Sequence, residues 1–337
     1  MKNAITLIAC LITLTAYSQD DACSNALYSA NKHYESGRIQ SALDVLSPCV
    51  KTKSLSGNEM FDATRLMAMC YIYLNKTDSA ELLTKKMLLL RPDYQTYHYV
   101  DPKELTATLS SYSVENTLDL GLHLGFAFNQ VNILKNYSAA ETPSTYISQL
   151  GLNAGVLAEY HFNKNLSGIS DPSINSISYL REMDNVAGSK KEYTELITTA
   201  ELPLIGRYYV NMFGLKLYAQ AGIQYGLWIR SFADVQSTNL NDGSVLQSST
   251  ETSEYRKSSM FGYQAGLGFA KPLGGGTVTM GLRYKSFLPN VVLPERRYDN
   301  VDFILSSQYI DSDFSLYSLG WSIGYQLPIT YSIKKVK

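Results

Sequence analysis

The chain has 337 residues, with 29 lysines and arginines against 30 aspartates and glutamates. This length suffices for two domains, and the balanced charge gives no electrostatic case for nucleic-acid binding. Tyrosine occurs 26 times and phenylalanine 11 times, a bias that suits aromatic rings anchored at membrane interfaces.

The first residues predict export. Residues 1–18 hold a lysine at position 2, an apolar run from Ala4 to Leu14 and the small-x-small end Ala16-Tyr17-Ser18. This pattern is typical of a secretory signal peptide, cleaved here before Gln19. The alternative is a lipoprotein signal ending at Cys10, but the apolar segment before Cys10 is short for one. No later apolar run is long enough to predict a transmembrane helix.

Residues 20–112 predict a small all-α domain. Apolar and small residues recur with a helical period, and Pro92 ends the last of the predicted helices. The domain contains two similar helical pairs, in which Ala42 and Ala80 open related segments 38 residues apart. This spacing resembles the tetratricopeptide repeat, whose small residues let paired helices pack closely. Two repeats are few for a stable solenoid, so a short helix after Asp101 is expected to cap the stack.

Three cysteines follow the predicted signal peptide: Cys23, Cys49 and Cys70. Cys23 opens the first predicted helix and Cys49 closes the second, and these ends are neighbours in an antiparallel hairpin. A disulfide is therefore expected in an oxidising periplasm, the alternative being that both are ordinary buried residues. Cys70 is expected in the core. No histidine spacing accompanies the cysteines, so neither a metal site nor a cofactor is predicted.

A strict alternation of side-chain type dominates the remainder of the chain. Its clearest example is Leu215–Arg230, where every odd position over sixteen residues is apolar or aromatic. Soluble strands usually have about 5–6 residues, whereas a strand that crosses a bilayer needs about 9–11. Seven further strands are predicted at 118–128, 150–162, 174–184, 193–209, 260–270, 277–287 and 315–327. The register of the 174–184 strand is left open.

Eight strands predict an all-β antiparallel transmembrane barrel over residues 116–330, followed by a basic tail at 331–337. Long outer loops are expected at 129–145, 186–192, 231–256 and 288–314, and inner turns at 163–173, 210–214 and 271–276. An even strand count returns both chain ends to one side, which places the helical domain in the periplasm. A soluble lipocalin-like barrel is the alternative. Strand length and the glycines on the polar face favour the membrane.

Three segments also resemble PorT-like small outer-membrane barrels. They are Ser148–Gly155, Ala200–Leu204 and the pair of glycine-rich strands that follow. The resemblance covers about 118–328 and implies an outer-membrane location in a Gram-negative bacterium. That family is functionally heterogeneous, and some members are tied to protein secretion and gliding. The usual aromatic end of the last strand is replaced here by Tyr325–Pro328 and the basic tail.

Several charged or histidine side chains share the polar face of the predicted strands. They are Asp119, His123, Glu159, His161, Glu201, Lys216, Arg230, Arg283 and Lys285. The interior of an eight-stranded barrel is just wide enough to be filled by side chains, and unpaired buried charges are costly. A paired charge network is therefore expected, formed by Asp119, Glu159, Glu201, Lys216, Arg283 and Lys285. No serine or aspartate nucleophile signature accompanies the histidines, so catalysis is not expected.

These features predict an outer-membrane anchored interaction or assembly protein, an accessory of secretion or envelope assembly. Its expected partners are outer-membrane lipid and an unidentified periplasmic or outer-membrane protein. Helical repeats bind partners on concave surfaces, and the candidate contact residues are Tyr71, Tyr73, Tyr94 and Tyr97. These tyrosines would otherwise pack the domain against the barrel rim. The alternatives from other classes are an outer-membrane hydrolase or lipid-modifying enzyme with an active site at the barrel rim, and a small pore.

Overall fold

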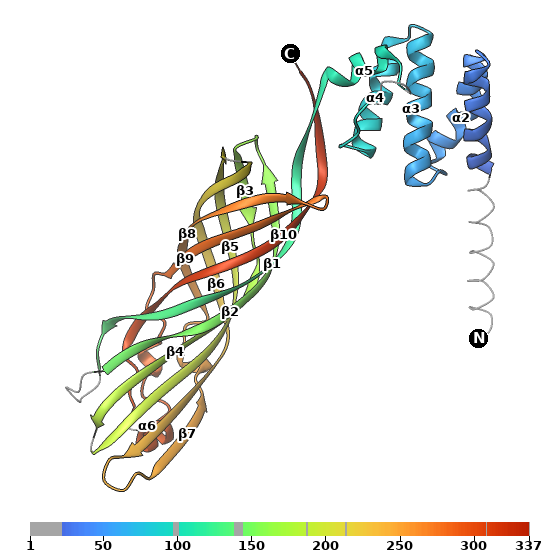
Figure 1. The fold of residues 1–337 in the computed structure, drawn as a ribbon. Coiled ribbons are helices and arrows are strands. Elements are labelled where there is room, and N and C mark those ends of the chain that lie inside the picture. The colour runs from blue at the N-terminus through green and yellow to red at the C-terminus, as the bar shows by residue number, and fades with distance from the viewer. Residues whose placement is uncertain are drawn as a thin grey trace, which may run out of the picture. The chain divides into compact units, whose positions relative to one another are not determined.

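The computed structural model describes residues 22–96, 101–137, 144–186, 188–212, 214–307 and 309–336. The chain divides into two compact units, one made of the residues up to Glu115 together with Tyr331–Lys337, the other of Asn116–Thr330. Figure 1 shows helices in the first unit and a barrel of strands in the second. The predicted signal peptide lies outside the described residues. Within them, no helix is both long and apolar enough to cross a membrane.

The helical unit contains a helix over residues 22–35 followed by four further helices. These are α2 (Ile39–Thr52), α3 (Gly57–Tyr73), α4 (Thr77–Leu90) and α5 (Lys103–Ser110). A capping box starts α3, because the Ser56 side chain accepts from the Glu59 amide and Glu59 accepts from the Ser56 amide. The core centres on α3, where Ala63, Ala68 and Cys70 are fully buried. Small residues at these positions let the neighbouring helices approach closely.

A disulfide joins Cys23 in the first helix to Cys49 in α2, with the two Cα atoms 5.6 Å apart. Cys70 is a free, buried thiol whose pKa is raised to about 11, because burial disfavours the thiolate. The thiol is therefore protonated and packs as a small apolar residue.

The last residues of the chain belong to the helical unit and continue a strand. β10 (Asp313–Lys335) runs through the segment that was predicted as a basic tail. Ile333 packs against the helical core, and the Val336 amide donates to the Ser111 carbonyl at 2.8 Å. Tyr331 and Ile333 continue the alternation of side chains along the strand. Lys334 and Lys335 pair with Glu115 and Glu81 of the same unit.

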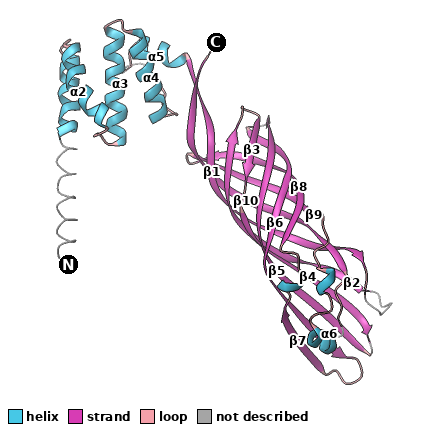
Figure 2. Cartoon of the chain, turned by 180° about the vertical axis from the view of Figure 1, so that it is seen from behind, coloured by secondary structure: helices cyan, strands magenta, loops and turns pink. Residues whose placement is uncertain are grey.

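Within the described residues the barrel has ten strands, most of them longer than predicted (Figures 1 and 2). They are β1 (Tyr112–Lys135), β2 (Ser144–His161), β3 (Leu166–Ser170), β4 (Ser173–Val186), β5 (Ser189–Met212), β6 (Leu215–Asn239), β7 (Val245–Glu251), β8 (Ser259–Leu273), β9 (Gly276–Phe287) and β10. A ring of eight closes in the order β1-β2-β4-β5-β6-β8-β9-β10, with β10 back beside β1. The predicted eight-stranded antiparallel barrel is therefore confirmed.

β3 and β4 share one position in this ring. Both strands pair with β2 and with β5. Their register on β5 is the same before and after the break, since Ser170 of β3 faces Leu204 and Ser173 of β4 faces Glu201. Between β3 and β4 the ladder is interrupted at Asp171 and Pro172. The expected inner turn at 163–173 was therefore wrong in its second half. An Asp-Pro pair usually marks a turn, but here the proline only removes one backbone donor from a continuing strand.

The expected outer loops were also wrong in part. β1, β2, β5 and β6 continue past the lipid-facing band, and the 231–256 segment contains the end of β6, all of β7 and the turn η1 (Ser253–Tyr255). The 288–314 segment contains the turn η2 (Pro294–Arg296) and α6 (Val301–Ser307). These elements are held together by an apolar cluster that includes Tyr193, Val235 and Phe303. Buried contacts between residues far apart in the sequence therefore order these segments, although their local sequence is typical of polar loops.

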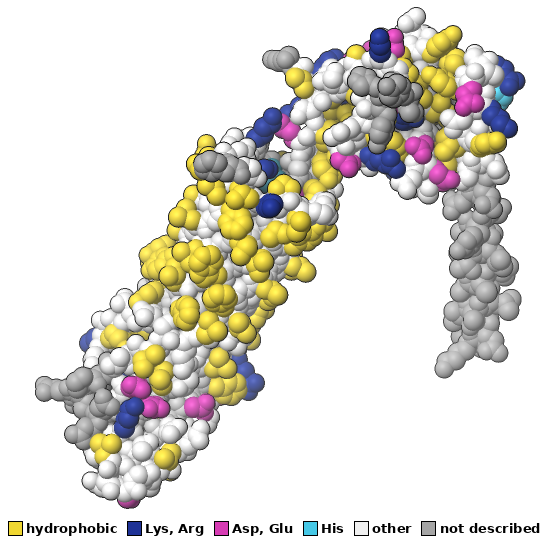
Figure 3. Space-filling view, viewed as in Figure 1, with side chains coloured by type: hydrophobic (Ala, Val, Ile, Leu, Met, Phe, Trp, Pro, Cys, Tyr) yellow, Lys and Arg dark blue, Asp and Glu magenta, His cyan; other side chains and the backbone are white. Residues whose placement is uncertain are grey.

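The two faces of each strand differ as the alternation predicted. On β1 the outward side chains, such as Leu122, Leu124 and Phe128, are exposed, whereas the inward Asp119 and His123 are buried. Figure 3 shows apolar side chains spread over the face of the barrel that it displays. An outward apolar belt with a polar interior is the arrangement of a barrel in lipid.

Candidate functional site

The barrel interior is filled by ion pairs arranged along its length. A first layer, toward the end where β1 begins, is centred on Glu159 of β2 and Arg207 of β5, both fully buried. The Glu159 carboxylate accepts from Arg207 Nη1 at 2.9 Å, Tyr209 Oη at 2.7 Å and Gln326 Nε2 at 3.0 Å. Ser167 also donates to it. Four side-chain donors therefore converge on this carboxylate.

Arg207 is enclosed on its other side. Its Nε and Nη2 donate to Gln220 Oε1 at 3.1 and 2.9 Å, and its guanidinium lies 4.2 Å from the ring centre of Tyr218. A Cβ at Gly268 or Gly281 would lie 2.4 Å from the Tyr218 hydroxyl. The glycines on the inner face therefore make the room that Tyr218 needs to cover Arg207.

A second layer joins Asp171 to two basic groups. His123 Nδ1 of β1 lies 2.8 Å from Asp171 Oδ1, and Arg283 of β9 donates to Asp171 Oδ2. Asp171 occupies the interrupted position before Pro172. Gly155 accommodates the histidine, since a Cβ there would lie 2.5 Å from His123 Cε1. This layer links three positions of the ring across the interior.

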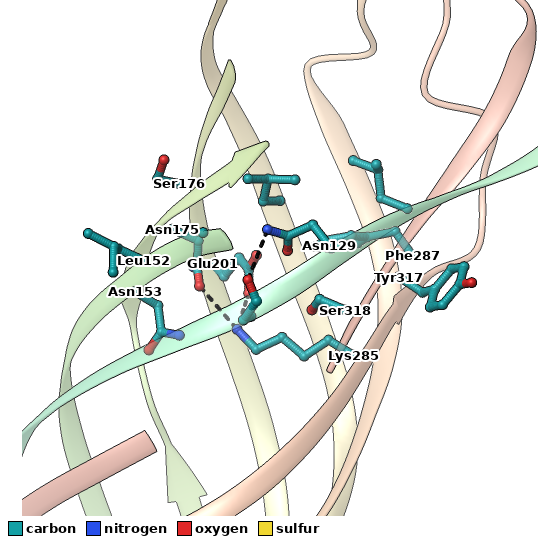
Figure 4. A pocket seen from close by; sticks show the side chains of 14 residues that line it. Asn129, Leu152, Asn153, Asn175, Ser176, Glu201, Lys285, Phe287, Tyr317 and Ser318 are labelled. Atoms are coloured by element: carbon teal, nitrogen blue, oxygen red, sulfur yellow. Dashed lines mark hydrogen bonds and ion pairs between the residues drawn. The ribbon is translucent and has the colours of Figure 1, made fainter. Parts of the chain in front are cut away.

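The third layer, shown in Figure 4, is formed by Glu201 of β5 and Lys285 of β9. Lys285 Nζ lies 2.8 Å from Glu201 Oε2 and donates to Asn175 Oδ1 at 3.1 Å. The cavity beside them has a volume of about 20 Å³ and is lined partly by Asn129 and Ser318. This is room for about one water molecule.

The fourth layer lies in the extension formed by the long outer parts of the strands. Glu195 accepts from Arg256 Nε and Nη2 at 3.0 and 2.8 Å and from Thr252 Oγ1 at 2.7 Å. Arg256 also pairs with Asp311 at 2.6 Å. Tyr193 donates to Glu195 at 3.1 Å and stacks on Tyr309, with ring centres 3.9 Å apart. This layer closes the interior on the far side of the apolar belt.

The remaining predicted interior residues have three outcomes. Asp119 pairs with His161, whose Nε2 lies 2.8 Å from Asp119 Oδ2 at the end of the barrel. Lys216 lies on the inner face but is exposed at the end of the barrel. Among the described residues it forms no ion pair, so the prediction that it belongs to the charge network was wrong. Arg230 points outward and pairs with Glu251 at 3.2 Å. An extra residue in β6, Ile229, reverses the alternation just before Arg230.

The sequence reasoning missed Arg207, Asp171 and the Glu195–Arg256 pair. Arg207 carried a usable signal, because it has the same parity as Glu201 on one predicted strand. Glu195 also has that parity. Asp171 and Arg256 carried none, since both were placed in connecting segments. Among the described residues, no group of three His, Cys, Asp or Glu side chains could hold a metal.

The helical unit offers a second candidate surface. Of the tyrosines predicted to meet a partner, Tyr71 and Tyr94 pack on the core of the unit, and Tyr94 donates to Asp101 at 2.6 Å. Tyr97 lies outside the described residues. Tyr73 is 68% exposed. On α4, Leu82 and Leu89 are also exposed, at 68% and 51%, and a spacing of seven places them on one helix face.

Glu81 of α4 secures the end of β10 to the same unit. It accepts from Tyr112 Oη at 2.7 Å and from Lys335 Nζ at 3.1 Å. These hydrogen bonds, first from Tyr112 and then from Lys335, lower the pKa of Glu81 below its ordinary value of 4.5. The ionised form is therefore the one that holds the strand end.

This lowered pKa predicts a pH-dependent attachment of residues 331–336. A carboxyl group with a lowered folded-state pKa contributes stability above its unfolded pKa and loses it as the pH falls through the folded value. We expect backbone amide protection of this segment, corrected for intrinsic exchange, to fall in acid below the ordinary pKa of 4.5. In Glu81→Gln the protection should be low at every pH. Glu104→Gln, an exposed change on α5, is the control. Equal profiles in all three proteins would contradict the assignment.

Sequence comparison identifies the barrel. A model of the outer membrane protein beta-barrel domain family matches residues 104–288, more than half of the chain. The chain belongs to this family. Membership places this outer membrane beta-barrel protein in the outer membrane of a Gram-negative bacterium, in contact with its lipid. No curated protein matches the sequence of the chain.

Solved structures with some similarity to this outer membrane beta-barrel protein are also membrane proteins of this type. Neisserial surface protein A gives a TM-score of 0.28 at 11% identity, over 62% of this chain and 97% of that one. OprG from Pseudomonas aeruginosa gives 0.32 at 13%, over 62% and 97%. A major outer membrane protein from Thermus thermophilus gives 0.34 at 12%, over 62% and 99%. At these scores the similarities add nothing to the family assignment.

Proposed function

We propose that the barrel anchors the helical unit at the periplasmic face of the outer membrane, where the unit binds a protein partner. The partner would belong to secretion or envelope assembly, in line with the resemblance to PorT-like barrels. The observation that carries the proposal is the exposure of Leu82 and Leu89 on one face of α4. Large exposed apolar side chains that share a face are typical of protein interaction sites.

The barrel interior supports an anchor more than a catalyst or a pore. Its buried charges pair with one another, which is a structural use of Glu159, Arg207, Glu201 and Lys285. The cavity beside Lys285 holds about 20 Å³, far less than the volume of a typical small-molecule site, about 300–1,000 Å³. We therefore propose that the function of the chain lies in binding by the helical unit.

Two substitutions on α4 test the proposal. Leu82→Glu with Leu89→Glu should leave the barrel inserted and heat-modifiable on gels, while the proteins that co-purify with it after cross-linking are lost. The reason is that charges on the contact face must be desolvated without a counter-ion. Lys51→Glu, exposed on α2, is the control and should retain the partners. Unchanged partners in the double variant would remove the basis of the proposal.

A further inference from the structure

An apolar groove of about 570 Å³ lies on the lipid-facing side of the barrel. Its lining comes from β2, the β3–β4 interruption, the start of β4 with the exposed Ile174, β5 and β6. Small residues, among them Ala154 and Ala200, alternate with the larger outward side chains of Val156, Leu202 and Leu227. The groove thus has hollows at Ala154 and Ala200, with the exposed side chain of Ile174 between them.

Two irregularities of the wall coincide with the groove. Pro172 lies in the break between β3 and β4, which share one position in the ring. Because β3 and β4 pair with β5 in the same register, the preceding residue Asp171 lies opposite Pro203 of β5. Two neighbouring prolines remove two donors from the ladder. On the other side, β6 carries the extra residue Ile229 between its pairings with Thr198 and Thr199. The barrel wall therefore has fewer backbone hydrogen bonds here, and the side chains of β6 change face at this point.

The extra residue also brings a cation to the outer side of the same strand. Arg230 follows Leu227 of the groove by three residues on β6, and its side chain is 57% exposed. Arg230 Nε and Nη2 donate hydrogen bonds to the Glu251 carboxylate at 3.2 and 3.5 Å. Within the described part of the chain, no hydrogen bond engages Nη1. A guanidinium with an open edge, three residues along the same strand from the apolar groove, suits a ligand that has both a phosphate and an acyl chain.

The position of the groove selects the leaflet. The outward apolar side chains of β6 run from Leu217 to Ile229, and the groove meets β6 at Tyr225 and Leu227. This is the half of the belt remote from the end where β1 begins. With the helical unit in the periplasm, as the proposed function has it, that half faces the outer leaflet. The anionic lipid of that leaflet in a Gram-negative outer membrane is lipopolysaccharide.

We propose that this groove binds one acyl chain of lipid A, with a lipid A phosphate on Arg230. The small side chains at Ala154 and Ala200 admit the chain on the two sides of Ile174, and Val156, Leu202 and Leu227 flank it. The site depends on the orientation given by the proposed function but not on any partner of the helical unit.

Native mass spectrometry of the full-length protein in mild detergent tests this site, with bis-phosphorylated lipid A as the probe. We expect one tightly retained lipid A per chain. Arg230→Gln should weaken binding roughly tenfold, as the loss of one charge-assisted contact does. Ala200→Phe, which fills the groove, should abolish it. Ala265→Phe is the matched control, because Ala265 is an exposed lipid-facing alanine on β8.

Heat-modifiable migration confirms that each variant is folded, and Arg230→Gln keeps the test valid if Ala200→Phe does not fold. Equal retention of lipid A by Arg230→Gln and the wild type would overturn the phosphate contact and with it the site. Equal retention by all variants would mean ordinary boundary lipid. Stronger retention of phosphatidylglycerol than of lipid A would overturn the choice of lipid. Co-purification of partners through Leu82 and Leu89 is measured separately, so either proposal can fail without the other.

Discussion

We expect Glu159→Ala to lower the free energy of unfolding of the barrel by about 3–5 kcal/mol. The Glu159 and Arg207 side chains are both fully buried. Removal of the carboxylate leaves the guanidinium without a counter-ion in an interior that water cannot reach, and three further donors lose their acceptor. The measurement is urea unfolding of the refolded protein in lipid vesicles, together with the temperature at which the heat-modifiable form disappears.

Two companion variants make this result specific. Lys216→Ala should change the stability little, because Lys216 is exposed at the barrel end. Replacement of both partners, Glu159→Leu with Arg207→Leu, should recover the part of the loss that comes from the unpaired guanidinium, while Ser167, Tyr209 and Gln326 still lack their acceptor. A stable Glu159→Ala barrel would contradict the buried pair. A stable barrel that had lost an activity would favour the enzyme alternative instead.

The second large effect is expected in the helical unit. Cys23→Ser with Cys49→Ser should lower the free energy of unfolding of this unit by about 3–4 kcal/mol, the chain-entropy value for a cross-link of this span. The disulfide closes a separation of 26 residues and ties the first helix to α2. Thermal unfolding followed by circular dichroism, with limited proteolysis of residues 22–52, measures the change.

Reductant provides the control for this prediction. Dithiothreitol should destabilise the wild type to the level of the double variant and leave the double variant unchanged. Because the barrel is a separate unit, its heat-modifiable migration should not respond to either treatment. Identical unfolding of the wild type with and without reductant would show that the cross-link does not stabilise the unit.

These experiments concern two units with different physical bases. The helical unit has an apolar core, a cross-link and the docked end of β10. The barrel has a belt that faces lipid and an interior of ion pairs, so its specific contacts are electrostatic and directional. This division explains why a charge deletion should affect the barrel most, whereas loss of a cross-link should affect the helices.

The sequence by itself determined the number of strand positions in the ring and the face on which most side chains lie. Period two is a local property of the backbone, since successive side chains of a strand point to opposite faces. It therefore placed Asp119, Glu159, Glu201, Arg283 and Lys285 inside the barrel, where the structure has them. The same rule, continued along β5, would have added Arg207.

Only the tertiary structure decided which charges meet and where the alternation changes phase. Asp171 faces His123 and Arg283 because a strand continues through an Asp-Pro pair that reads locally as a turn. Arg230 lies outside because one extra residue in β6, set by pairing with β5, reverses every later side chain. Partners such as Asp171 and Arg283, which are 112 residues apart in the sequence, meet only when the ring closes, and no local pattern encodes that closure.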